Sequence, residues 1–203
     1  MPDQYKTILK ETLETLHKAK GSKFFGYAFP VTTETEVKEV LTRIKKQHPK
    51  ARHWCYAWAL GSEDVRTRAN DDGEPSNTAG QPILRQITSL GITNVLLVSV
   101  RYFGGVKLGV GGLINAYGTS AELTLEAATI ITKDLYFVVK LQFGYDLINK
   151  VQRVIKQFQL HIHKQQLLED CQLTLEIPKA KFKLAHMALS DIYGVTIKKD
   201  SKD

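Results

Sequence analysis

Residues 95–118 read VLLVSVRYFGGVKLGVGGLINAYG, which predicts a buried strand at 95–102, a glycine-rich turn, and a helix at 112–128. Backbone N–H groups in such a turn, at the N-terminus of a helix, are suited to binding anions. Basic and aromatic side chains in the same turn suit phosphate contacts and base stacking. The residues predicted to bind an anion or a nucleic acid are Arg101, Tyr102, Phe103, Gly104, Gly105, Lys107, Gly109, Gly111 and Gly112.

Two standard nucleotide-binding motifs do not fit this turn. It lacks the GxxxxGK[ST] pattern of a P-loop, and its GVGG lacks the GxGxxG spacing of a dinucleotide-binding turn. Glycines also let a helix pack closely against a sheet, and that structural explanation covers part of the pattern. We therefore predict no bound cofactor, and we keep both the anion-binding and the packing interpretation.

Composition and charge indicate a globular protein with a mildly basic surface. Of the 203 residues, 43% are hydrophobic and 24% charged, and no apolar run reaches the roughly 20 residues of a membrane helix. The net charge of +7 favours nucleic acid or an acidic partner, although an ordinary soluble surface explains it equally well. The two cysteines lie far apart without metal-binding spacing. We expect a cytoplasmic protein with no membrane partner.

Hydrophobic periodicity predicts an α+β protein of two domains, 1–131 and 132–203. Expected elements of the first domain are strands at 23–31 and 53–60, a helix at 34–48 capped by Thr33 or Thr35, and a helix capped by Ser76 or Thr78 that runs to about Leu90. Expected elements of the second domain are strand 136–143, helix 146–158, strands 160–168 and 171–177, helix 180–193 and strand 195–199. That βαββαβ order is the ferredoxin-like arrangement.

A polar segment, DDGEPSNTAG at 71–80, carries three acidic residues. Asp71, Asp72 and Glu74 are the residue types of a hard-metal site or a general base. The favoured interpretation is a turn whose acids complement the next helix dipole or pair with Arg101 or Lys107, so we predict no metal site. Nearby, His53 is either a catalytic base or, more simply, a hydrogen-bonded packing residue. The proposed motif surface consists of His53, Asp71, Asp72, Gly73, Glu74, Pro75, Ser76, Thr78 and Gly80.

Four blocks of the sequence together resemble the YigZ/IMPACT family, in its bacterial two-domain form. They are KGSKFFGYAFPV at 20–31, ARHWCYA at 51–57, DDGEPSNTAGQPIL at 71–84 and RYFGGVKLGVGGLINAYG at 101–118. Two positions depart from the family pattern. Asn115 stands where members usually carry an arginine, and Asn77 stands where they often carry glycine. Asn115 completes the set of predicted anion-binding positions. The loss of the arginine at this position weakens an anion contact.

The resemblance implies a fold for each domain. The first is expected to be similar to the second domain of a small-subunit ribosomal protein and to domain IV of elongation factor G. The second is expected to be ferredoxin-like and similar to domain V of that factor. Eukaryotic relatives regulate translation by binding an activator of a starvation-responsive kinase, and nucleic-acid binding is suggested by fold similarity for the bacterial members.

Three functions follow from these observations, in order of preference. The first is an RNA- or ribosome-associated binding protein that acts in translation or its regulation. The second is an enzyme acting on a phosphorylated small molecule or a nucleotide, with the acids of 71–74 beside the anion site. The third is an adaptor that binds a translation-related protein, which an exposed apolar groove beside Tyr102 and Phe103 would favour.

Overall fold

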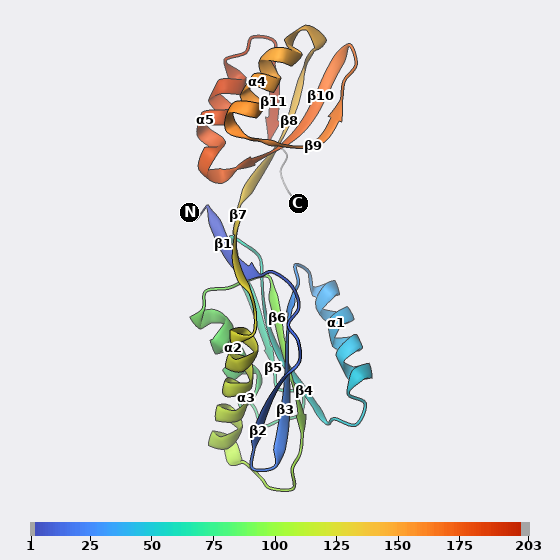
Figure 1. Cartoon of the computed structure of the whole chain (residues 1–203), viewed down its shortest axis with the longest axis vertical. Helices are drawn as coiled ribbons and strands as arrows, with labels where there is room; N and C mark the ends of the chain where they lie inside the picture. The colour runs from blue at the N-terminus through green and yellow to red at the C-terminus, as the bar shows by residue number, and fades with distance from the viewer. Residues whose placement is uncertain (1–2, 200–203) are drawn as a thin grey trace. The chain divides into compact units, whose positions relative to one another are not determined.

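The structure, a computed structural model, describes residues 3–199 and divides into two compact units (Figure 1). The N-terminal unit spans Tyr5–Lys133. The C-terminal unit runs from Asp134 onward and also includes Asp3 and Gln4. Among the described residues, no helix combines the length and the apolar character that crossing a membrane requires.

The N-terminal unit is built on a five-stranded antiparallel sheet with the order β2-β3-β6-β4-β5. The strands are β1 (Gln4–Ile8), β2 (Thr15–Ala19), β3 (Ser22–Pro30), β4 (His53–Leu60), β5 (Arg66–Asn70), β6 (Val95–Tyr102) and β7 (Ile130–Asp134). β1 and β7, the first and the last of these strands in the sequence, pair with each other in a separate two-stranded sheet. The helices are α1 (Glu34–Gln47), α2 (Gly80–Ser89) and α3 (Gly109–Glu126).

Side-chain alternation along the strands gives the sheet two buried faces. On β6, Val95 and Leu97 pack under α2 and α3, whereas Leu96 and Val98 pack under α1 on the opposite face. Figure 1 shows α2 and α3 on one side of this sheet and α1 on the other. Because the period is two, Arg101 and Tyr102 at the end of β6 point to opposite faces, and this separates the two halves of the site described below.

The C-terminal unit is a four-stranded antiparallel sheet, in the order β11-β8-β10-β9, with both helices on one face. Its elements are β8 (Tyr136–Gly144), the short 3-10 helix η1 (Tyr145–Leu147), α4 (Ile148–Phe158), β9 (His161–Gln166), β10 (Asp170–Pro178), α5 (Lys179–Ser190) and β11 (Thr196–Lys199). The core lies between the sheet and α4 and α5 (Figure 1). The predicted α+β class and the βαββαβ order of this region are confirmed.

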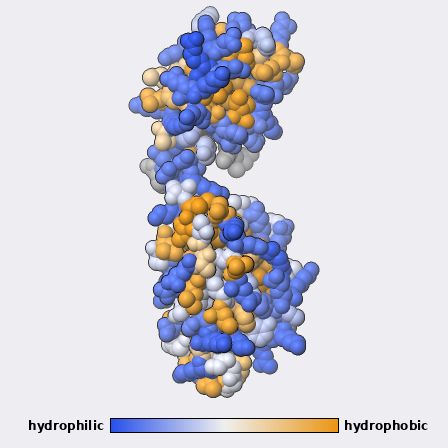
Figure 2. Space-filling view, in the orientation of Figure 1, coloured by the Kyte–Doolittle hydropathy of each residue, from blue (hydrophilic) through white to orange (hydrophobic). Residues whose placement is uncertain are grey.

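Two expectations about local structure differ from what the structure shows. Helix α3 spans Gly109–Glu126, so it begins three residues before the expected start at 112. Strands β1, β2 and β7 were not predicted, and most of their residues are exposed or half-buried. On the face of the N-terminal unit shown in Figure 2, hydrophobic residues form separate groups among hydrophilic ones.

Candidate functional site

The acidic turn at 71–80 is held in shape by the carboxylate of Asp71. Its two oxygens accept the backbone N–H groups of Asn77, Ala79 and Gly80 at 2.8–2.9 Å. These bonds satisfy N–H groups at the start of α2, where they complement the helix dipole. The expected capping by Ser76 or Thr78 is therefore wrong, because the N-cap residue is Ala79 and the hydroxyl of Thr78 donates to the carbonyl of Pro75 at 2.6 Å.

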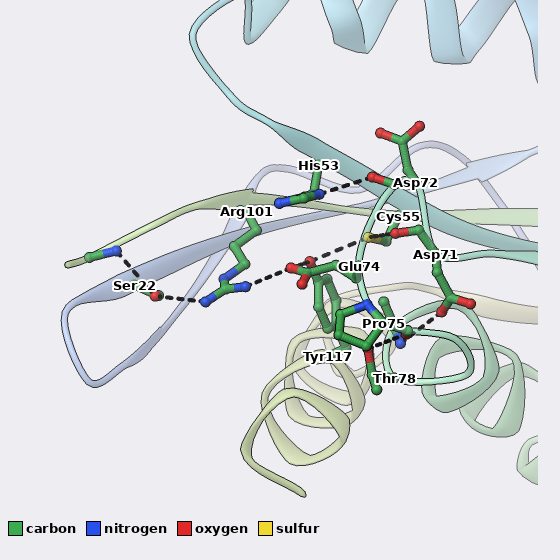
Figure 3. Close-up of polar contacts among 12 residues, drawn as sticks. Ser22, His53, Cys55, Asp71, Asp72, Glu74, Pro75, Thr78, Arg101 and Tyr117 are labelled. Atoms are coloured by element: carbon green, nitrogen blue, oxygen red, sulfur yellow. Dashed lines mark hydrogen bonds and ion pairs between the residues drawn. The ribbon is translucent and has the colours of Figure 1, made fainter. Parts of the chain in front are cut away.

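Asp72 points away from Asp71 and fixes the start of β4. Its Oδ2 accepts the backbone N–H of Trp54 at 2.8 Å, and its Oδ1 lies 3.9 Å from the Nζ of Lys45 on α1. Its backbone carbonyl accepts a hydrogen bond from Nδ1 of His53 at 2.9 Å (Figure 3). His53 is thus hydrogen-bonded to the turn, which is the packing interpretation that the sequence favoured.

Glu74 lies at the centre of a buried polar network (Figure 3). Its Oε1 accepts from the guanidinium of Arg101 at 2.7 Å and from the hydroxyl of Tyr117 at 2.8 Å. The side chains of Glu74 and Arg101 are only 5% and 7% exposed. A buried charge of this kind is stable only when it is paired and hydrogen-bonded, so this ion pair fastens the acidic turn to β6 and α3.

The thiol of Cys55 extends the same network without becoming reactive. Its Sγ lies 3.0 Å from the carbonyl of Asp71 and 3.3 Å from the hydroxyl of Tyr117. Burial raises the pKa of the Cys55 thiol far above its usual range, and burial also raises the pKa of Tyr117. Both groups are therefore neutral, and the thiolate that a nucleophilic cysteine needs is strongly disfavoured.

Arg101 also anchors the beginning of the glycine-rich turn. Its Nη2 lies 3.4 Å from the hydroxyl of Ser22, which accepts the backbone N–H of Gly104 at 3.2 Å (Figure 3). A Cβ on Gly104 would lie 1.9 Å from the backbone carbon of Gly21, so the turn and the β2–β3 hairpin touch through their main chains. Because its guanidinium is buried, Arg101 acts here as a support for the turn and is not on the surface.

Beyond Gly104 the turn is open to solvent. Gly105 and Gly109 have φ angles of +85° and +73°, which favour glycine. Lys107 and Asn115 are exposed, and so are the apolar side chains Phe103, Val106 and Val110, at 53%, 53% and 60%. Helix α3 has no side-chain cap and no acidic residue in its first turn.

The structure thus brings part of the predicted set together and separates the rest. Glu74 joins the acidic turn to Arg101, whereas Asp71 and Asp72 are each used by a different neighbouring segment. Within residues 3–199, no three side chains of His, Cys, Asp or Glu are grouped so that they could hold a metal ion. The pairing of an acid with Arg101, which the sequence left as an alternative, is the arrangement observed.

A surface pocket on the α1 face of the sheet was not predicted as a whole. It has a volume of about 330 Å³ and is lined by Gly21, Lys23, Phe25, His48, Tyr102 and Phe103. The ring of Tyr102 packs edge to face against Phe25 and His48, and Phe25 and His48 are tilted relative to each other, with centroids 5.4–5.8 Å apart. Tyr102 and Phe103 were predicted as base-stacking residues; the alternation of KFF at 23–25 is the signal that could have added Lys23 and Phe25.

A chain of hydrogen bonds runs from this pocket through His48 and Tyr27 to the half-exposed Glu14. The hydroxyl of Tyr27 donates to the carboxylate of Glu14, so its oxygen accepts from Nε2 of His48 at 2.5 Å. In neutral His48, Nδ1 is then the acceptor for the hydroxyl of Tyr102, at 3.1 Å. Burial lowers the pKa of His48, and the nearby charge of Glu14 opposes that effect in part.

Comparison with known proteins shows which family the chain is similar to. The family model for the Impact N-terminal domain matches residues 20–125. IMPACT family member YvyE of Bacillus subtilis is 37% identical over 159 residues, which cover 78% of this chain and 73% of that protein.

Two solved structures are also similar to this chain. One, described as a hypothetical protein, aligns over the full length of both chains with a TM-score of 0.74 and 26% identity. Another, described as the two-domain translational regulator Yih1, is 25% identical over 59% of this chain and 46% of its own, with a TM-score of 0.37. The family model covers the pocket, the acidic turn and the glycine-rich turn, from the turn after β2 to Leu125 in α3, and the chain belongs to the IMPACT family.

Proposed function

We propose that this protein binds RNA through the aromatic pocket of its N-terminal unit and acts in translation or its regulation. The pocket itself is the observation that supports this. It combines aromatic rings from Phe25, Tyr102 and Phe103 with the ammonium group of Lys23. Single-stranded nucleic acids bind where bases stack on aromatic side chains beside cations that contact the phosphates. Membership of the family suggests the link to translation.

The glycine-rich turn supplies the second half of the proposed surface. Lys107 and the backbone of Gly105, Gly109 and Gly111 are exposed next to Phe103, at the uncapped start of α3. Exposed N–H groups there suit a phosphate. In this proposal Arg101, Glu74 and the turn at 71–80 do not touch RNA, because their contacts position the glycine-rich turn. That separate use of the acids also favours a binding role over an enzymatic one.

The test is binding of a fluorescent single-stranded RNA to the full chain at several salt concentrations. Lys23→Gln combined with Phe103→Ala removes one exposed cation and one exposed ring, and each stacked base is worth about 1–3 kcal/mol. We expect affinity to fall about tenfold or more. Lys38→Gln combined with Leu13→Ala changes exposed residues elsewhere on the same unit and serves as the matched control. Equal affinity in the two double variants would contradict the proposal.

A second candidate is the protein adaptor, and the exposed apolar side chains of the turn favour it. Phe103, Val106 and Val110 are all more than half exposed beside the pocket. A partner protein docked there should be lost from affinity capture when Val106→Glu and Val110→Glu are combined. Capture that survives this change would exclude the surface.

We also propose finer fold relationships. The order β11-β8-β10-β9 is that of a ferredoxin-like sheet, which supports similarity of the C-terminal unit to domain V of elongation factor G. Similarity of the N-terminal unit to the second domain of a small-subunit ribosomal protein and to domain IV of that factor remains our proposal. So does the domain boundary at 131/132.

A further inference from the structure

The hydrogen bonds behind the aromatic pocket run in a fixed direction, because they end at a carboxylate. Glu14 accepts hydrogen bonds and donates none, so the hydroxyl of Tyr27 donates its proton there. The oxygen of Tyr27 then accepts from Nε2 of His48, 2.5 Å away. Burial lowers the pKa of His48, so its ring is neutral at pH 7 and carries a single N–H. With that proton on Nε2, Nδ1 of His48 is an acceptor.

This direction decides what the hydroxyl of Tyr102 offers to a ligand. Its single proton is donated to Nδ1 of His48, 3.1 Å away. A hydroxyl has one proton and two lone pairs, so the oxygen of Tyr102 keeps acceptor capacity alone. Because Tyr102 and His48 both line the pocket, their shared hydrogen bond belongs to its wall. A ligand group that meets the oxygen of Tyr102 must therefore be a donor.

The size and the walls of the pocket suit one planar ring. Its volume of about 330 Å³ lies at the low end of the range for small-molecule sites. The rings of Phe25 and Tyr102 pack edge to face with centroids 5.6 Å apart, and the ring of Phe103 is exposed. Lys23 lies directly opposite Tyr102 in the register of β3 and β6, which places a cation beside the same ring. Stacking surfaces next to a cation suit a nucleobase and its phosphate.

We propose that the pocket selects a nucleobase with an exocyclic amino group, adenine or cytosine, because that group donates to the hydroxyl oxygen of Tyr102. In hypoxanthine and uracil a carbonyl oxygen stands at the same ring position, and two acceptors that face each other repel. Tyr102 is thereby a specificity-determining residue, and His48, Tyr27 and Glu14 position its proton. The inference rests on the proposed function, which it deepens by naming the class of base.

The experiment compares nine-residue RNAs that consist of uridine except at the central position. Adenosine and purine riboside share one ring system, and only adenosine carries the amino group; inosine carries a carbonyl there. We expect the full wild-type chain to bind the adenosine RNA about threefold to tenfold more tightly than the purine riboside RNA, which is the worth of one neutral hydrogen bond. The inosine RNA should bind no more tightly than the purine riboside RNA. Equal affinity for the adenosine and purine riboside RNAs overturns the inference without any substitution in the protein.

Tyr102→Phe keeps the stacking ring and removes the acceptor. We expect the adenosine and purine riboside RNAs to bind this variant equally, with little change for the purine riboside RNA because the ring is retained. The matched control is Tyr56→Phe, which removes a hydroxyl from the same face of the sheet outside the pocket lining and should keep the wild-type preference. Thermal unfolding shows whether each variant is folded. A folded Tyr102→Phe variant that keeps the full preference for adenosine contradicts the inference.

His48→Phe tests the direction of the hydrogen bonds. It keeps a ring at this position but removes the acceptor for Tyr102, whose proton is then free to point into the pocket. The hydroxyl can then donate to the carbonyl of hypoxanthine as well as accept from the amino group of adenine. We expect the ratio of adenosine to inosine affinity to fall relative to the wild type. An unchanged ratio in the folded variant contradicts the assigned direction, and with it the inference.

The inference and the proposed function can fail separately. If the three RNAs bind the wild type equally, and Lys23→Gln with Phe103→Ala weakens the binding of all three, the proposed function stands and the inference falls. A clear preference for adenosine that Tyr102→Phe abolishes supports both. A wild-type chain that binds none of the three RNAs at low salt contradicts both.

Discussion

Single side chains in this protein carry several contacts each, and Glu74 shows it most clearly. One carboxylate oxygen serves both the guanidinium of Arg101 and the hydroxyl of Tyr117, inside a region closed to water. Desolvation makes each charge costly when alone, so removing one partner of this pair costs the fold far more than removing one partner of the surface pairs Arg43–Glu11 and Arg66–Glu34.

Breaking the buried pair from one side should be strongly destabilising. Glu74→Gln and Arg101→Met should each lower the free energy of unfolding by about 3 kcal/mol or more, because a buried charge loses its partner. The double variant should lose much less than the sum. Urea unfolding of the four proteins measures this cycle, and strictly additive losses would show that the charges are not coupled.

Stability should fall as the pH drops below about 6.5, and His48 should account for part of that fall. Its pKa is lowered in the folded protein by burial, so acid protonates the unfolded chain first. The contribution is complete above the unfolded pKa and is lost as the pH falls toward the folded one. Urea unfolding at pH 7.5, 6.5 and 5.5 should show a flatter profile for His48→Gln than for the wild type. The exposed variant His161→Gln should follow the wild type.

At the scale of elements, the glycines of the 101–118 stretch have different roles. Gly104 is required where the turn meets the β2–β3 hairpin, whereas Gly118 lies inside α3 with open space where a side chain would point. The packing interpretation from the sequence therefore applies to Gly104 and not to Gly118.

Two alanine substitutions should separate these roles. Gly104→Ala places a methyl group against the backbone of Gly21 and should destabilise the fold by about 1–3 kcal/mol or more. Gly118→Ala removes a flexible residue from a helix interior and should stabilise the fold by about 0.5–1 kcal/mol. Thermal unfolding measures both. A midpoint for Gly104→Ala that equals that of the wild type would mean that the hairpin and the turn are not in contact.

Sequence patterns predicted the elements whose burial is regular and missed those whose burial is not. The strands at 53–60 and 95–102 match β4 and β6 in full, because most residues of β4 and all but one of β6 are buried and none is exposed. Most residues of the paired strands β1 and β7 and of the edge strand β2 are exposed or only half-buried, so these strands carry little apolar alternation. The cap of α2 was missed for another reason. Asp71 lies nine residues before Gly80, and local capping rules cover only adjacent positions.

The candidate site was predictable as a set of segments but not as a geometry. Motifs singled out Tyr102 and Phe103, which line the aromatic pocket, together with Arg101, which alternation turns to the other face of the sheet. His48 entered the site from the end of α1, where no motif marks it. Whether a charge is exposed or paired depends on tertiary contacts, and the sequence had left the pairing of Arg101 open.

At the scale of the whole molecule, exposed lysines occur in both units. In the N-terminal unit, Lys23 lines the aromatic pocket and Lys107 lies in the glycine-rich turn, and in the C-terminal unit Lys164 and Lys198 are exposed on the sheet. The basic residues behind the net charge of +7 are therefore not confined to one unit.

Each core also encloses one free cysteine, Cys55 in β4 and Cys171 in β10. A thiol reagent can reach either sulfur only when the surrounding unit opens. The modification rate of each cysteine therefore reports how often its own unit opens. Mass spectrometry after timed exposure should show slow modification of both in native buffer. In Glu74→Gln, Cys55 should be modified faster than in the wild type, and the modification rate of Cys171 should stay the same. Equal acceleration at both would mean that the two cores open in one event, and the protein thus carries its own probes of local unfolding without any added label.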